Sequence, residues 1–342
     1  MGLGRLTPGR MSPRSDRRVL VALALGLPIS AVFLWLAIRN ADLALVRRIL
    51  EDARLGFVAL AILAIAAMYG LQAVRWRMVA ASPQVRLARF YEMVVSGVAC
   101  NNVLPARLGD LLRARWVAVE ARMPSGRGLG TVVLDRGCDV AALFVLLIIG
   151  LAAVATSAWL VRIAVGAAAV LAGLGAAVLF SRAYTGRRER GRRQRGLVRR
   201  VLRDTAEALA EPIGGRRPVA WIALSLGAWT VWAVAAIFVG RSLGLELSLL
   251  DAVFVAAVMN LGVAIPSSPG FVGTYEWLGV AALGLLGIGS EEALAFSILL
   301  HACWYVPTTL GGGIALGTRG LVRMRRARTA RAAVRTINPG DT

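Results

Sequence analysis

The sequence contains no lysine, a single histidine and three cysteines, and only 7% of its residues are aromatic. With His301 as the one histidine, a histidine-based metal cluster is excluded. Cys100, Cys138 and Cys303 lack the spacing of metal or redox motifs, so we interpret them as small, reduced apolar residues. No nucleotide, metal or nucleophile motif is present. The sequence therefore predicts no cofactor, no metal and no enzymatic activity.

Apolar residues make up 58% of the chain, above the roughly 45–50% of an ordinary soluble domain. They form long runs without the alternation of a membrane β-barrel. Because a spanning helix needs about 20 apolar residues, we expect an all-α, polytopic membrane helix bundle of about seven to nine hydrophobic segments. The expected segments are 19–38, 56–74, 90–104, 138–156, 159–180, 219–240, 250–265, 271–288 and 294–316.

The arginines are clustered and give a formal net charge of +21. Dense blocks occupy 1–18, 182–217 and the region after residue 317. Such blocks flank membrane spans on the cytoplasmic side and attract anionic headgroups. Because no aromatic residues interleave with them, nucleic acid is a poor candidate partner. We expect a multi-pass protein of the cell (inner) membrane with its N-terminus and Arg-rich loop in the cytoplasm.

The apolar segments and the arginine blocks together divide the chain into three parts. A basic cytoplasmic N-terminus (1–18) precedes a single membrane domain (19–316), and a basic disordered tail (317–342) follows it. Within the membrane domain, halves 19–180 and 219–316 are joined by the Arg-rich loop 181–218.

Each half contains an apolar run that ends in the same pattern of proline, glycine four residues later and then an acid. The sets are Pro105, Gly109 and Asp110, and Pro266, Gly270 and Glu276, preceded by Asn102 and Asn260 respectively. Proline and glycine break helices, and broken helix at membrane depth is tolerated only inside protein or beside a watery cavity. Matched breaks in two halves indicate a transporter's central site; two ordinary loops are the alternative. We expect 250–265 to cross the membrane, and 90–104 either to cross or to re-enter.

Charged residues follow the first break. Arg107, Asp110 and Arg113 recur every three residues, so in a helix they share a face and can form ion pairs. Arginine binds phosphate through two parallel hydrogen bonds, which suggests an anionic headgroup site. The alternative is an interfacial helix with a ladder of salt bridges.

A second charged group precedes residue 140, and several polar residues lie near the second break. Asp135, Arg136 and Asp139 can neutralise one another or orient the first group's arginines. Ser267 and Ser268 offer hydroxyls where a helix starting near Gly270 would favour an anion. Glu276 is interpreted as a carboxylate at membrane depth that pairs with an arginine, and His301 as a packing residue or a proton relay.

Three motifs together resemble those of a known family. They are Asn102-(x)2-Pro105-x-Arg107-x-Gly109-Asp110-(x)2-Arg113, Asp135-Arg136-(x)2-Asp139 and Pro269-Gly270-(x)2-Gly273-(x)2-Glu276. They resemble the flippase-like transmembrane domain family of lysylphosphatidylglycerol synthases over roughly residues 15–320, as a free-standing member without the synthase domain. The family usually has glutamate at Asp110, often glutamate at Asp135, and often arginine at His301. The resemblance implies a helical inner-membrane protein that moves a lipid between leaflets.

We therefore expect a lipid translocator for a phospholipid or lipid-linked headgroup. Its partners would be membrane lipids, anionic or lipid-linked, and lipid-synthesis enzymes. Phosphate would bind Arg107, Arg113 and Arg136, while the acids hold those arginines or contact a cationic headgroup. The proposed binding residues are Asn102, Arg107, Asp110, Arg113, Asp135, Arg136, Asp139, Asn260, Ser267, Ser268, Glu276 and His301. The alternatives are a membrane-embedded transferase acting on a lipid carrier and a non-catalytic partner of lipid-modifying enzymes.

Overall fold

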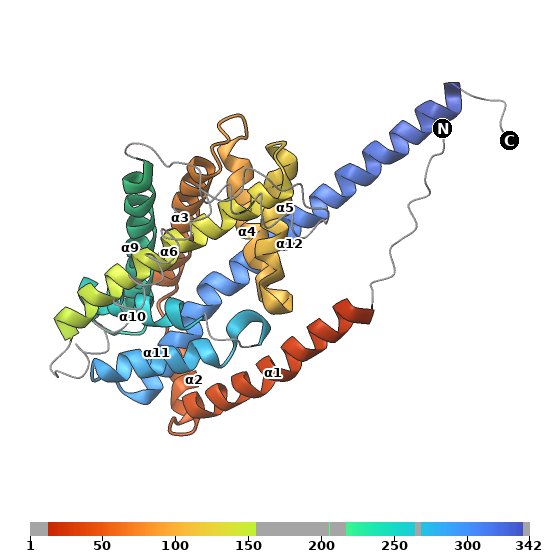
Figure 1. Cartoon of the computed structure of the whole chain (residues 1–342). Helices are drawn as coiled ribbons and strands as arrows, with labels where there is room; N and C mark the ends of the chain where they lie inside the picture. The colour runs from red at the N-terminus through yellow and green to blue at the C-terminus, as the bar shows by residue number, and fades with distance from the viewer. Residues whose placement is uncertain (1–12, 155–204, 206–216, 264–267, 338–342) are drawn as a thin grey trace.

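The structure is a computed structural model that describes residues 13–154, 205, 217–263 and 268–337. These residues form a bundle of helices and no strand, so the all-α prediction is confirmed for them (Figure 1). The elements are α1 (Pro13–Ile38), α2 (Leu43–Glu51), α3 (Leu55–Val79), α4 (Leu87–Val103), η1 (Pro105–Arg107), α5 (Leu108–Glu120), α6 (Ser125–Val154), α9 (Arg217–Ser242), α10 (Leu249–Gly262), η2 (Pro269–Phe271), α11 (Thr274–Leu285) and α12 (Ser290–Ile337).

Three helical stretches among the described residues are long and apolar enough to cross a membrane: α3, α9 and Ser290–Arg319 of α12. A fourth exists if Gly26–Ile38 and α2, bent by 83° to each other, are one broken span. The predicted total of seven to nine segments stays a prediction. Helix α10 has 14 residues and is about 21 Å long, so a crossing there would need residues beyond the helix.

Helices α3 and α9 pack against each other along their length and run antiparallel. At one end, the Arg54 N–H donates to the Ser242 carbonyl over 2.9 Å. At the other end, Arg75 Nη1 donates to Ser225 Oγ over 2.7 Å. Fully buried alanines on both helices, such as Ala73 and Ala228, belong to the main apolar core. Small residues let helix backbones approach closely, which is how helices pack in lipid.

The structure differs from the sequence prediction in three elements. Helix α2 lies within the segment 39–55, which we expected to be a connection, and the Asp42 side chain caps it by accepting from Ala44 N at 2.8 Å. Helix α6 begins at Ser125 and contains the Asp135 motif, which we placed before a span. Helix α12 is continuous to Ile337 through most of the predicted disordered tail, where arginine and alanine both favour helix.

The span 159–180 and nearly all of the Arg-rich loop 181–218 lie outside the described residues, as do residues 1–12 of the N-terminus.

The first predicted helix break is present, and around the second α10 ends at Gly262 and α11 begins at Thr274, while Pro266 itself lies outside the described residues. Helix α4 ends before Pro105, whose ring cannot continue it, and Arg107 adopts a left-handed φ of 53° where α5 begins. The Gly109 N–H donates to Asn101 Oδ1 over 2.7 Å, so the preceding helix supplies a partner for the start of α5. In the second break, Gly270 has a φ of 75°, a conformation that favours glycine.

The breaks lie against each other. Arg107 Nη2 donates to the carbonyl of Val263, at the end of α10, over 2.5 Å. A Cβ on Gly270 would lie 3.3 Å from the Asn102 carbonyl and 2.7 Å from the Tyr305 ring, so the second break passes closely over the end of α4. The predicted relation between the halves as a repeat remains a prediction.

Candidate functional site

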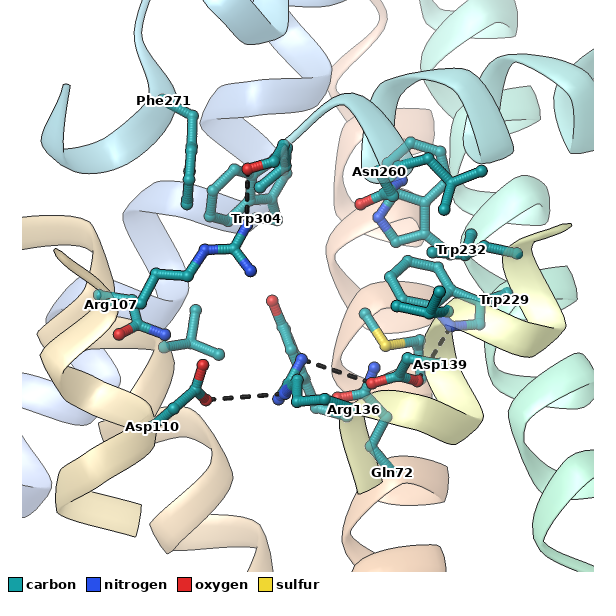
Figure 2. Close-up of a pocket in the computed structure, with 18 of the residues that line it drawn as sticks. Gln72, Arg107, Asp110, Arg136, Asp139, Trp229, Trp232, Asn260, Phe271 and Trp304 are labelled. Carbon is teal, nitrogen blue, oxygen red and sulfur yellow. Dashed lines mark hydrogen bonds and ion pairs between the residues drawn. The ribbon is translucent and has the colours of Figure 1, made fainter. Parts of the chain in front are cut away.

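A cavity of about 330 Å³ lies beside the two breaks and is drawn in Figure 2. Its polar wall contains Gln72, Asn101, Asn102, Arg107, Asp110, Arg136, Asp139 and Asn260. Its aromatic wall contains Tyr69, Phe144, Trp229, Trp232, Phe271, Tyr275 and Trp304. The cavity therefore combines charge with aromatic surface, which suits a headgroup that has both a charged group and a flat apolar face.

Arg136 lies across the charged side of the cavity. Its Nε is 3.6 Å from Asp110 Oδ1, and its Nη1 is 3.4 Å from Asp139 Oδ2 (Figure 2). These ion pairs are longer than charge-assisted hydrogen bonds of about 2.7–2.9 Å. Arg136 Nε, Asp110 Oδ1 and Asp139 Oδ2 are buried, and among the described residues none of them has a hydrogen-bond partner. The site thus retains unused hydrogen-bonding capacity at three charged atoms.

Arg107 has no carboxylate partner among the residues that the structure describes. It donates to the Val263 carbonyl, and its guanidinium carbon lies 5.7 Å from the centroid of the Phe271 ring. The side chain extends from η1 toward the second break, while Asp110 lies below it beside Arg136 (Figure 2). A guanidinium without a paired acid is the natural partner of an anionic group entering the cavity.

A second, fully buried layer of charges lies behind the cavity wall. Asp135 Oδ1 accepts from Arg75 Nε at 2.9 Å and from Arg75 Nη2 at 2.8 Å, and Asp135 Oδ2 accepts from Arg113 Nη2 at 2.9 Å. The Arg113 guanidinium also lies 4.2 Å from the Trp76 ring centroid, a cation–π distance. One carboxylate therefore holds two arginines from α3 and α5 against α6.

Asp139 connects this layer to the cavity. Its Oδ1 accepts from Arg75 Nη1 at 2.7 Å and from the Trp229 indole N–H at 3.0 Å. Its Oδ2 faces Arg136 in the cavity. The buried layer thus fixes both an acid and an aromatic residue of the cavity wall.

These contacts revise two of the predicted roles. Arg113 and Asp135 are fully buried and do not line the cavity, so Arg113 contacts Asp135 where we expected it to bind phosphate. Arg75, which was not predicted, makes the largest number of hydrogen bonds in the layer. The available signal was an arginine directly after the apolar run 56–74, because charge at membrane depth needs a partner.

Glu276 and His301 pair with each other directly behind the aromatic wall. His301 Nδ1 lies 2.5 Å from Glu276 Oε1, and the imidazole stacks on Trp304 with centroids 4.9 Å apart. Glu276 Oε2 accepts from the Gly273 N–H at 2.6 Å, at the start of α11. The partner of Glu276 is therefore a histidine, where we considered an arginine, and neither residue lines the cavity.

The predicted amides line the cavity, whereas the predicted serine does not. Asn102 Nδ2 donates to Thr309 Oγ1 of the neighbouring α12 over 2.8 Å. Asn260 Nδ2 donates over 2.9 Å to the carbonyl of Ala256, which lies in the same helix, α10. Ser268 is buried beside α1, where its N–H donates to Ser30 Oγ over 2.8 Å. Ser267 lies outside the described residues.

The site presents guanidinium and carboxylate groups to a ligand. Among the described residues, no group of three or more His, Cys, Asp or Glu side chains is placed to hold a metal ion. The arrangement can bind an anion, orient a polar headgroup through the amides and stack an apolar or sugar face on the aromatic wall.

Residues 19–312 match the family described as lysylphosphatidylglycerol synthase TM region. The resemblance predicted from the three motifs is confirmed. A curated relative is "Glycosyltransferase AglD" of Haloferax volcanii, 29% identical over 88% of this chain and 54% of the relative. The chain thus spans about half the length of the curated relative that it matches. Because that relative is named as an enzyme, our expectation of no enzymatic activity is wrong on this comparison.

Proposed function

The chain belongs to the lysylphosphatidylglycerol synthase TM family, and from this premise we propose that it binds the headgroup of an anionic or lipid-linked membrane lipid in the cavity and moves it between leaflets. The headgroup would enter between the two helix breaks, while its acyl or prenyl chains stay in the bilayer.

One observation carries the proposal: an arginine without an acidic partner, Arg107, shares a cavity with Arg136 and an aromatic wall. The phosphate of a lipid would lie between these two guanidiniums, since arginine binds phosphate through paired hydrogen bonds. Trp229 and Trp304 would pack against the rest of the headgroup. A volume of about 330 Å³ suits a headgroup and is at the small end for whole ligands.

Lipid translocation in vesicles tests this function. The purified protein is reconstituted in phosphatidylcholine vesicles that contain trace acyl-labelled phosphatidylglycerol or a labelled polyprenyl-phosphate sugar, and dithionite reports label exposed in the outer leaflet. We expect exposure above that of empty vesicles for one of the two probes. In Arg107→Gln the rate should fall at least about fivefold, since one charged phosphate contact contributes about 1 kcal/mol or more.

The matched control is Arg48→Gln, an exposed arginine of α2 outside the cavity, which should translocate like the wild type. Exposure no faster than in empty vesicles for both probes would refute the proposal. If Arg107→Gln and Arg48→Gln lost the same share of the translocation rate, the loss would come from the lower net charge of the protein and not from the cavity.

The name of the curated relative favours a second candidate, transfer of a sugar from a lipid carrier. In that reaction the Asp110 carboxylate would accept the proton of an acceptor hydroxyl. The acceptor oxygen would bond to the anomeric carbon as the bond from that carbon to the lipid phosphate breaks, and the released lipid phosphate would stay with Arg107 and Arg136. Asp110 is the suitable acid because it lines the cavity, whereas Asp135 is enclosed by arginines.

Transfer of radiolabelled sugar from a polyprenyl-phosphate sugar to a lipid or glycan acceptor tests this candidate. Asp110→Asn should abolish the transfer and leave translocation of the unreacted lipid measurable. If Asp110→Asn transfers sugar at the wild-type rate, the candidate fails.

A further inference from the structure

A second hollow lies at the other side of the α3–α9 pair and shares no lining residue with the first cavity. It has a volume of about 430 Å³ and is formed where α3 ends, the chain turns into α4, and α9 begins. Its lining consists of Val74, Arg77, Met78, Ala81, Ser82, Pro83, Leu87, Arg217 and Trp221. Among these residues two are basic and none is acidic, so the described lining of the hollow, which we call the α3–α9 groove, is positively charged.

The two arginines of the groove differ in how they are held. Arg77 Nε donates to the Val85 carbonyl over 2.9 Å, and its Nη2 donates to the Pro83 carbonyl over 2.5 Å, so the turn fixes this guanidinium in place. Arg217 is exposed at the start of α9, with no ion pair or hydrogen bond to the described residues. A guanidinium fixed by the turn, beside one that has no partner among the described residues, is a preorganised arrangement for one anionic group.

Trp221 adds an unused donor. Its side chain lines the groove, the residue is only 7% exposed, and its indole Nε1 is buried without a hydrogen-bond partner among the described residues. Buried indole N–H groups usually have a partner, and leaving one unpaired costs about 1–3 kcal/mol. An acceptor oxygen of a bound ligand would satisfy it.

The position of the groove indicates the source of that ligand. Its floor of Val74, Met78 and Leu87 is apolar, and Met78 and Leu87 are exposed on the bundle surface. It lies at the end of α3 opposite the Arg54–Ser242 contact, and its Arg217 ends the Arg-rich segment that we predict to be cytoplasmic. Basic residues at that leaflet attract anionic lipids, and an apolar floor beside them accommodates acyl chains.

We propose that the α3–α9 groove binds an anionic phospholipid of the cytoplasmic leaflet. Its phosphate lies between Arg77 and Arg217 and accepts from the Trp221 indole, while its acyl chains run over the apolar floor. This site is separate from the cavity at the helix breaks, because the two have no lining residue in common.

Native mass spectrometry of the full chain in detergent tests the site, with dioleoyl-phosphatidylglycerol titrated as the probe and dioleoyl-phosphatidylcholine as the neutral comparison. We expect Arg217→Gln and Arg77→Gln each to weaken binding of phosphatidylglycerol about fivefold, from roughly one charge near the membrane surface. Arg217→Gln is the safer variant because this side chain holds no other part of the described chain. Trp221→Phe, which keeps the ring and removes the donor, should weaken the same binding event.

The controls separate this site from others. Arg86→Gln changes an exposed arginine next to Leu87 that does not line the groove, and Arg107→Gln changes the first cavity; both should leave this binding event intact. The assignment of a lipid site would be overturned by any of three results. They are equal binding of phosphatidylcholine and phosphatidylglycerol, unchanged phosphatidylglycerol affinity in Arg217→Gln, and full competition by millimolar inorganic phosphate.

Discussion

Asp135 is the residue whose change tests the architecture of the site most severely. Asp135→Asn keeps the shape of the side chain and removes the charge that Arg75 and Arg113 share. Both arginines are fully buried, and the one acid left near Arg113 among the described residues would be Asp110, at 3.6 Å. Breaking a buried pair by removing one partner costs about 3–5 kcal/mol, because a charge is left without compensation. We expect a loss of that size in the free energy of unfolding.

Reversible denaturation in mixed micelles measures this loss. The matched control is Glu51→Gln, which removes the acid of an exposed ion pair with Arg47 and should change stability little. A second substitution, Arg113→Met, should recover part of the stability of Asp135→Asn, since it removes the charge that was left unpaired. If Asp135→Asn unfolds within about 1 kcal/mol of the wild type, or if Arg113→Met adds a further loss, the buried layer does not act as we describe.

Three further changes have defined outcomes. Gly109→Ala should prevent folding or cost at least about 1–3 kcal/mol in thermal unfolding, because its Cβ would lie 2.0 Å from the Gly97 carbonyl, while Gly137→Ala, with nothing within 4 Å, should be tolerated. Glu276→Gln should destabilise the protein by about 1–3 kcal/mol, because it weakens the contact with His301, and an unchanged melting curve would contradict this. Arg107→Gln should lower the free energy of unfolding by no more than about 1 kcal/mol, the value of its hydrogen bond to Val263, while translocation falls at least about fivefold; a larger loss of stability would contradict a binding role.

The sequence supports a prediction of the helices and breaks because each depends on local chemistry. Pro105 ends α4 wherever the helix packs, and an apolar run as long as 56–74 forms a helix in any bundle. Helix α2 was missed because only nine residues form it, and its amphipathic pattern resembles that of a charged connection. The extent of α12 depends on helix propensity across a basic stretch, which charge density alone does not reveal.

The site was predicted in part. The spacing of Arg107, Asp110 and Arg113 predicted ion pairs along one helix face; Arg113 approaches Asp110 at 3.6 Å, whereas Arg107 has no carboxylate partner among the described residues. Spacing along one helix could not show which member faces the cavity and which faces α3, because that depends on the rotation of α5 against its neighbours. The contact that the spacing could not reveal is the one between Arg75 of α3 and Asp135, which lie 60 residues apart in the sequence.

The most direct test of the central claim is the identity of lipids bound to the purified protein. Lipids that co-purify with the wild type are extracted and compared by mass spectrometry with those of Arg107→Gln and of the control Arg48→Gln. The account predicts that the amount of one class of phosphate-bearing lipid per protein is the same in the wild type and in Arg48→Gln and is lower in Arg107→Gln, in which the lipid of the α3–α9 groove remains. The same lipids in the same amounts on all three proteins would contradict a headgroup site at the helix breaks.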